Sequence, residues 1–166
     1  MSPVSQLAIR PLRRADRAAL AAAFERLSEE SRHRRFLGPK PRLTERELDR
    51  LTDVDHVTHE AIVAMAPGDR MVGVARYAPW PGRPGVADLA VTVADDWQGH
   101  GLGRLLARRA VEAARRNGMT VLTASTLWEN EPARRMLSRL GFRPVGAQGG
   151  VLDFRLELVQ LTASAA

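Results

Sequence analysis

The feature that most constrains this fold is a strand pattern that runs through a glycine-containing turn straight into an amphipathic helix. Residues 86–93 alternate between apolar and smaller or polar side chains, as a strand does. Gln98, Gly101 and Gly103 follow, and the apolar spacing after them predicts a helix over residues 101–116. A strand, a tight turn and a long helix in immediate succession predict a layered fold in which the turn lies at the end of the sheet.

The turn has the properties of an anion site. Gly101 and Gly103 lack a Cβ atom, so the backbone can bend tightly and a ligand can approach it closely. The first N–H groups of a helix have no intrahelical partner and lie at the positive end of the helix dipole. Arg104, Arg108 and Arg109 add positive charge nearby. The stretch therefore predicts a pyrophosphate-binding site.

Two common phosphate-binding motifs do not fit this turn. A Walker loop needs Lys followed by Ser or Thr after its last glycine, but Gly103 leads to Arg104. The dinucleotide fingerprint needs a third glycine, and Arg104 stands where that glycine should follow Gly99 and Gly101. A third pattern, Gln-x-x-Gly-x-Gly, is filled without a mismatch by Gln98, Gly101 and Gly103.

This third pattern resembles the pyrophosphate-binding signature of the GNAT superfamily of acyl-CoA-dependent N-acyltransferases. A second stretch is similar to that family's N-x-x-A-x-x-L-[YF]-x-x-x-G-F pattern, with Asn130, Ala133, Met136, Gly141 and Phe142 in register. The two stretches occur in the family's order, and the resemblance covers nearly the whole chain. It implies an N-acetyltransferase that uses acetyl-CoA as cosubstrate, without a metal.

A closer resemblance is to actinobacterial protein lysine acetyltransferase domains of the Pat type. Residues 31–36 and 86–91 carry it. Some Pat proteins have a separate cyclic-nucleotide domain, for which a chain of 166 residues has no room. This resemblance implies a protein lysine as the acceptor, and a small-molecule amine remains the alternative within the same class of enzyme.

Periodicity and turn signals predict the rest of the architecture. Strands are expected at residues 4–12, 56–65, 70–77, 86–93, 121–127, 142–145 and 151–158. Helices are expected at residues 16–27, 28–40, 44–51, 101–116 and 130–140. We therefore expect one α/β (α+β) domain over residues 1–166, with its core at about 4–160 and a frayed tail at 161–166. The GNAT-like form of this fold is a mixed, mostly antiparallel central sheet of six to seven strands flanked by about four helices.

The resemblance also implies site residues. The backbone of Val91, Thr92 and Val93 would contact the pantetheine arm and the acyl carbonyl, and Asn130 would hold that arm or a catalytic water. The pyrophosphate would be bound, mostly by backbone amides, at Gln98, Gly99, His100, Gly101, Leu102, Gly103 and Arg104. Each assignment has a structural alternative. Val91, Thr92 and Val93 could belong to a plain core strand, the glycines could form a tight turn with nothing bound, and Asn130 could be a helix N-cap.

A general base is needed because an amine is mostly protonated at neutral pH and cannot then attack a thioester. Pat-like domains place a glutamate on the strand before the glycine turn, and the matching position here is Asp88. The alternative is a solvated strand carboxylate or a partner for an arginine. Glu129 and Glu60 are lesser candidates for the base.

The general acid of the family is a tyrosine, but Leu137 occupies its position in this chain. Ser138 is a poor substitute because its pKa is much higher, and Tyr77, the only tyrosine, is predicted on another strand. Water could protonate the thiolate instead. This departure, together with Asp88 in place of glutamate, motivates a second hypothesis, a non-catalytic acyl-CoA-binding module.

Composition excludes several other classes of function. The absence of cysteine excludes disulfides, thiolate metal sites and a cysteine nucleophile. His56 and His59 on a strand would point to opposite faces, and His33 and His100 complete no ligand set, so no metal site is expected. The net charge of +6 suits a phosphate-bearing ligand. Nucleic-acid binding is a third hypothesis, disfavoured because the arginines are dispersed among 19 acidic residues.

Location and assembly follow only as expectations. No apolar run reaches the length of a membrane span, and residues 1–14 contain no apolar signal segment, so we expect a cytoplasmic protein without a membrane partner. A homodimer is an assembly state that the sequence leaves open.

Overall fold

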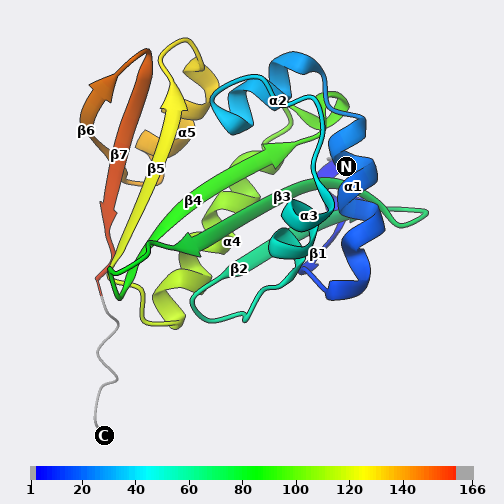
Figure 1. Ribbon diagram of the computed structural model, residues 1–166, viewed down its shortest axis with the longest axis horizontal. Coiled ribbons are helices and arrows are strands. Elements are labelled where there is room, and N and C mark those ends of the chain that lie inside the picture. The colour runs from blue at the N-terminus through cyan, green and yellow to red at the C-terminus, as the bar shows by residue number, and fades with distance from the viewer. Residues whose placement is uncertain (1–2, 160–166) are drawn as a thin grey trace, which may run out of the picture.

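Seven strands in the described part of the chain, residues 3–159 of the computed structural model, form one sheet (Figure 1). Their bounds are β1 (Ala8–Pro11), β2 (Glu60–Ala66), β3 (Arg70–Pro79), β4 (Val86–Val93), β5 (Val121–Leu127), β6 (Arg143–Gln148) and β7 (Val151–Glu157). The order across the sheet is β1-β2-β3-β4-β5-β7-β6. Every neighbouring pair is antiparallel except β4 and β5, which run parallel.

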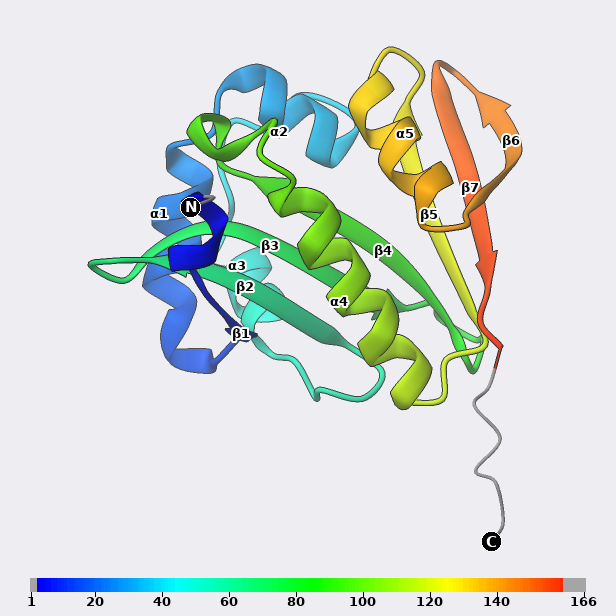
Figure 2. The ribbon, with the colours of Figure 1, turned by 180° about the vertical axis from the view of Figure 1, so that it is seen from behind.

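Five α-helices within the same residues cover the two faces of the sheet. They are α1 (Arg17–Glu25), α2 (Glu29–Phe36), α3 (Glu45–Thr52), α4 (Leu102–Arg116) and α5 (Glu131–Arg139). The long helix α4 crosses one face of β2–β4, whereas α1–α3 lie on the other face (Figures 1 and 2). None of the helices among residues 3–159 combines the length and the apolar character that crossing a bilayer requires. The expected mixed α/β fold is confirmed.

The central strands are buried on both faces, so the core has two halves. On β2, Ile62 and Ala64 belong to the half under α4, and Val63 and Met65 belong to the half under α1 and α3. Because side chains alternate across a strand, a continuous apolar run is what such a doubly covered strand requires.

The helix α3 begins as its sequence predicts. The Thr44 hydroxyl accepts a hydrogen bond from the Glu47 N–H at 3.2 Å, and the Glu47 carboxylate accepts one from the Thr44 N–H at 2.8 Å. This reciprocal pair is a capping box. Lys40 also pairs with Glu47, and this contact, with the Thr44 bonds, lowers the pKa of Glu47 to about 2.

Several predicted boundaries differ from the structure. The first expected strand is a short 3₁₀ turn (Pro3–Gln6) followed by β1 alone. Residues 56–59, expected to begin a strand, form a loop in which the Asp55 carboxylate accepts the N–H groups of Val57 and His59. The strand β3 continues to Pro79, opposite Ala87. The predicted tail at 161–166 lies outside the described residues.

The packing of α4 on β3 leaves no room beside Gly73. A Cβ atom built there would lie 2.7 Å from Cδ1 of Leu106, which is completely buried. This close contact sets how near α4 lies to the centre of the sheet.

We therefore expect Gly73→Ala and Leu106→Ala to be coupled. Leu106→Ala alone should destabilise the fold by about 2–5 kcal/mol because it leaves a cavity. Gly73→Ala alone should cost about 1–3 kcal/mol through overpacking. In the double variant the added methyl occupies space that Leu106 vacates, so the total loss should be smaller than the sum. Urea unfolding of all four proteins measures this, and simple additivity would contradict it.

Candidate functional site

The strands β4 and β5 separate after three residue pairs. They pair in parallel at Val86 with Val121, Ala87 with Leu122 and Asp88 with Thr123. Beyond this point the two strands diverge in a V shape (Figures 1 and 2). From Leu89 onward the edge of β4 that faces β5 has no strand partner among residues 3–159. The strand β4 is therefore splayed away from β5, and it exposes main-chain groups in the middle of a sheet.

A groove of about 1350 Å³, open to solvent, lies at this V. It brings together seven of the residues that the sequence predicts as cofactor-binding: Val91, Thr92, Val93, Gln98, Gly99, Gly103 and Asn130. Helix α2 adds Ser31, Arg34 and Arg35, and α5 adds Met136. Sequence reasoning missed the contribution of α2, although the arginines at its end were visible.

The glycine turn presents its main-chain amides without using them internally. Gly99 and Gly101 have φ values of +77° and +82°, which glycine adopts without strain. No neighbouring atom would meet a Cβ at either position. Across the described part of the chain, no hydrogen-bond acceptor binds the N–H groups of residues 99–104. These donors therefore remain available at the N-terminus of α4.

The other side chains of the turn have different positions. His100 is exposed and its Nδ1 lies 2.8 Å from the Gln98 carbonyl oxygen. Leu102 is completely buried in the core, and Arg104 is exposed. Of the three, none lines the groove with its side chain, which fits the expectation that the main chain carries this site.

Gln98 and Asp95 fix the turn to its surroundings. The Gln98 amide donates to the Val93 carbonyl at 3.1 Å and to the Ser31 hydroxyl at 3.0 Å. The Asp95 carboxylate accepts the Ser28 N–H and hydroxyl, each at 2.9 Å, and the Ser31 hydroxyl at 2.5 Å. Partial burial raises the pKa of Asp95, but the hydrogen bonds from these serines outweigh it and lower the pKa overall. The turn and the start of α2 thus form one hydrogen-bonded unit.

Asn130 is the N-cap of α5. Its Oδ1 accepts a hydrogen bond from the Ala133 N–H at 3.3 Å. Its side chain also borders the groove and the adjoining hollow beside Asp88. Asn130 therefore has the N-cap role that the sequence offered as an alternative, and it also lies at the groove.

Asp88 lies where β4 and β5 part. Its Oδ1 accepts a hydrogen bond from the Thr123 hydroxyl at 2.6 Å, and the Trp80 indole N–H donates to that hydroxyl at 2.9 Å. Burial raises the pKa of Asp88, while Thr123 and the positive charge of Arg35 act in the opposite direction. A partly buried carboxylate with a raised pKa at the edge of a groove is a plausible proton acceptor by its chemistry.

The lesser candidates for acid–base chemistry lie elsewhere. Glu60 is buried on β2, where it accepts hydrogen bonds from the Ala61 N–H and contacts Nδ1 of His56. Glu129 is exposed and does not line the groove. The Tyr77 hydroxyl donates to the Val57 carbonyl at 2.8 Å, so it is held beneath α4. Leu137 is buried, and Ser138 is exposed outside the groove.

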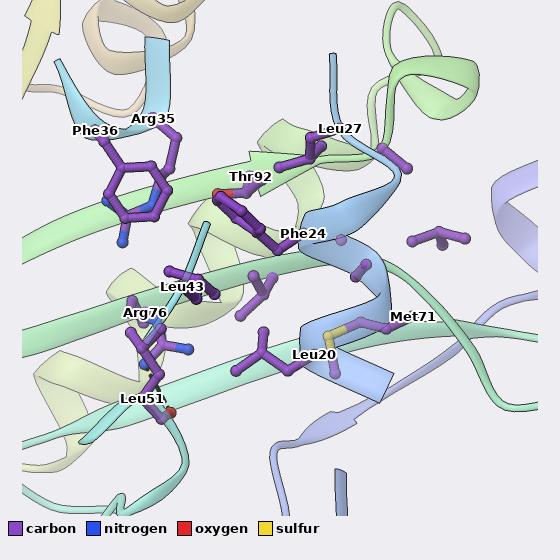
Figure 3. A pocket seen from close by; sticks show the side chains of 15 residues that line it. Leu20, Phe24, Leu27, Arg35, Phe36, Leu43, Leu51, Met71, Arg76 and Thr92 are labelled. Atoms are coloured by element: carbon purple, nitrogen blue, oxygen red, sulfur yellow. Dashed lines mark hydrogen bonds between the residues drawn. The ribbon is translucent and has the colours of Figure 1, made fainter. Parts of the chain in front are cut away.

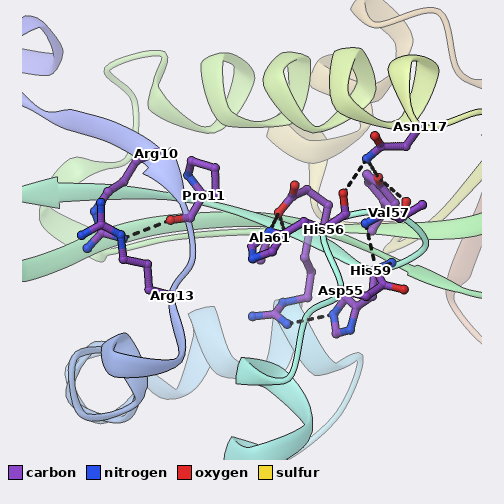
Figure 4. Close-up of polar contacts among 12 residues, drawn as sticks. Arg10, Pro11, Arg13, Asp55, His56, Val57, His59, Ala61 and Asn117 are labelled. Atoms are coloured by element: carbon purple, nitrogen blue, oxygen red, sulfur yellow. Dashed lines mark hydrogen bonds and ion pairs between the residues drawn. The ribbon is translucent and has the colours of Figure 1, made fainter.

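The expected placement of two histidines on a strand needs revision. His56 and His59 lie in the loop before β2, not on a strand, since His56 has a φ of +58° (Figure 4). Arg32 serves the fold, because its guanidinium stacks on Phe24 at 4.5 Å and donates to two carbonyls. Within residues 3–159 no group of three or more His, Asp or Glu side chains is arranged as metal ligands would be.

Comparison with known proteins finds relatives over most of the chain. A family model described as an acetyltransferase (GNAT) domain matches residues 6–143. An acetyltransferase of Pseudomonas aeruginosa is 39% identical over 137 residues, which are 81% of this chain and 73% of that protein. The acetyltransferase Pat of Mycolicibacterium smegmatis is 30% identical over 118 residues, 69% of this chain but only 34% of the longer protein. The GNAT domain of the S. lividans protein PAT superimposes with a TM-score of 0.84 at 26% identity, covering 92% of this chain and 90% of that domain.

We expect Asp95→Asn to weaken the fold in a pH-dependent way. The folded state lowers the pKa of Asp95, so its carboxylate stabilises the fold above the ordinary value of 3.8, and this contribution is lost as the pH falls through the folded-state pKa. The variant should be less stable than the wild type at pH 7, and the difference should shrink at low pH. Urea unfolding at both pH values measures it.

The exposed Asp53, which lies 3.9 Å from Arg14, provides the control. Asp53→Asn should change the free energy of unfolding by no more than about 0.5 kcal/mol at either pH. An Asp95→Asn difference that persists unchanged at low pH would show that the carboxylate charge is not its source.

Proposed function

The chain belongs to the GNAT acetyltransferase family, and we propose that it transfers the acetyl group of acetyl-CoA to a primary amine by direct attack within a ternary complex. One observation supports this above the others. The unpartnered edge of β4 leads directly into a turn whose amide donors are unused. An extended thioester with a diphosphate at one end is complementary to that combination.

The donor would bind with its diphosphate at residues 99–104. The amides there carry the partial positive charge of the N-terminus of α4, and Arg104 adds a full charge close by. From this point the pantetheine arm would follow Val91, Thr92 and Val93 along the open edge of β4. Asn130 lies across the groove and would contact the arm from α5.

The open edge of β4 would also serve the reaction. Main-chain N–H groups on that edge are fixed by the pairing of β4 with β3 on its other side. Such preorganised donors stabilise the oxyanion that forms when an amine attacks the thioester carbonyl. Holding both substrates in one groove supplies the further advantage of proximity.

The proton from the attacking amine needs an acceptor, and Asp88 is the carboxylate beside the splay. In the balanced reaction the amine nitrogen forms a bond to the carbonyl carbon, and the carbon–sulfur bond breaks. The amine loses one proton to Asp88, directly or through water, and the departing thiolate gains one. Because Leu137 is apolar and buried, we assign protonation of the thiolate to water and not to a side chain.

The remaining expectations from the sequence stay predictions. A protein lysine and a small-molecule amine are both acceptors of the proposed class. The cytoplasmic location, a homodimer, and the absence of a nucleic-acid partner are likewise untested properties.

The donor site is tested by placing the same bulky residue at both ends of α4. Gly101 and Gly118 have matching conformations, with φ values of +82° and +79°, and open space at the Cβ position. Gly101→Trp should weaken acetyl-CoA binding by more than about 100-fold because it covers the amide donors, whereas Gly118→Trp should leave it unchanged. Calorimetry measures both affinities. Equal affinities of the two variants would remove the turn from the donor site.

The base is tested with two matched substitutions. Asp88→Asn should lower kcat by about 100-fold or more and leave the affinity for acetyl-CoA unchanged, because only proton acceptance is lost. Asp53→Asn changes an exposed carboxylate that lies 3.9 Å from Arg14, and kcat should stay unchanged.

The pH dependence gives a second reading of Asp88. Burial raises its pKa, so wild-type activity should fall as the pH drops through a value above the ordinary 3.8. That acidic limb should be absent in Asp88→Asn. Wild-type turnover in this variant would exclude Asp88 as the base, and acetyl-CoA binding without turnover in the wild type would contradict the enzymatic proposal itself.

A further inference from the structure

A second cavity lies between α1–α3 and the sheet, beside the groove, and its total of about 530 Å³ includes solvent space at its open side. Its walls are mostly apolar, with Leu20, Phe24, Phe36, Leu43 and Met71 among them (Figure 3). Its enclosed part measures about 50 Å³, which is room for a few water-sized groups and hence for a short apolar side chain. Two positively charged side chains, Arg35 and Arg76, line the same cavity.

Arg76 is buried without a counter-ion. Only 5% of its surface is exposed, and it projects from the middle of β3. Its Nη1 donates to the Leu51 carbonyl at 2.9 Å and lies 3.3 Å from Nε2 of His59. For residues 3–159, neither a carboxylate contact at Arg76 nor any further hydrogen bond from its Nε and Nη2 is found. A buried charge without a counter-ion lowers the stability of the fold unless a ligand of opposite charge neutralises it.

Arg35 brings a second positive charge to the same end of the cavity. It projects from α2, while Arg76 projects from the sheet (Figure 3). Burial and the charge of Arg35 together lower the pKa of Arg76 to about 9. Asp88 is the acidic group whose charge acts on Arg35, and no carboxylate acts in the same way on Arg76. Two cations and one anion leave an excess of a single positive charge, which one carboxylate would neutralise.

The cavity adjoins the proposed site of transfer. Arg76 lies opposite Ala90 of β4, and Asp88 and Thr92 are the next residues on the same face of that strand. Thr92 and Arg35 line both the cavity and the groove. A ligand anchored at the two arginines would therefore extend toward the position where β4 and β5 part.

We propose, on the basis of the proposed function, that the acceptor is a small amino acid with an apolar side chain. Its carboxylate binds between Arg35 and Arg76, its side chain occupies the apolar cavity, and its amine lies beside β4 near Asp88. The amine nitrogen takes the acetyl carbon as the carbon–sulfur bond breaks, its proton passes to Asp88 and the thiolate takes one from water. A polyamine would be repelled by the arginines, and a lysine within a polypeptide offers no nearby carboxylate.

The experiment compares acceptors that differ only in the carboxylate. Thiol release from acetyl-CoA is measured with small apolar amino acids such as alanine, valine and leucine, with their amides, and with a lysine-containing peptide. The free amino acids should show a kcat/KM at least about 10-fold above their amides, as expected for a charge-assisted contact. Equal or better use of the amides or of the peptide would overturn the proposal.

Variants assign this preference to the two arginines. Arg76→Gln should raise KM for the free amino acids by about 10- to 100-fold, while KM for the amides and for acetyl-CoA stays unchanged. Arg35→Gln should act in the same direction and covers the case in which Arg76→Gln does not fold. Arg42→Gln removes an exposed arginine between α2 and α3 and should change nothing. An equal loss for acids and amides in the Arg76 and Arg35 variants would indicate a structural role only.

Calorimetry with the same acids and amides separates this inference from the proposed function. Tighter binding of the acids without any turnover would contradict the catalytic proposal and support the carboxylate site. Turnover of amines without any preference for the acids would support the catalytic proposal and contradict the carboxylate site. Failure of every amino acid in the series to bind would overturn the carboxylate site directly.

Discussion

The limited pairing between β4 and β5 is the constraint on which the rest of the structure depends. Three parallel residue pairs hold the two halves of the sheet together, and beyond Asp88 the strands part. Both halves stay rigid because each is completed elsewhere, β4 by β3 and β5 by β7. The opened sheet therefore exposes main-chain hydrogen-bonding groups in fixed positions, where an ordinary sheet would have paired them.

Much of this architecture could be predicted because its causes are local. The glycine turn requires φ values that glycine favours, and the capping box at Thr44 and the N-cap at Asn130 require side chains at fixed spacing. Asp88 was identified through the family resemblance, from its position on the strand before the glycine turn. Boundaries were less accurate at residues 56–59, where the hydrogen bonds of Asp55 override a strand-like composition.

The contacts that could not be predicted join segments far apart in the chain. Ser28 and Ser31 lie 67 and 64 positions before Asp95 in the sequence, and nothing near either segment signals the other. Arg76 was an ordinary residue of an expected strand, and Arg35 was one member of a basic cluster. Their juxtaposition depends on the register of β3 with β4 and on where α2 rests, both of which are properties of the assembled fold.

Helix α2 belongs to two sites at once. Its first turn is bonded to Asp95 at the entrance of the glycine turn, and its last turn carries Arg35 into the neighbouring cavity. The helix is eight residues long, so its start beside the glycine turn and its end beside the cavity are only about two turns apart. If a ligand at one site shifts this helix, it also changes the free energy of filling the other site, and thermodynamic reciprocity makes the effect equal in both directions. Ordered addition of two substrates would then arise from one short, rigid element.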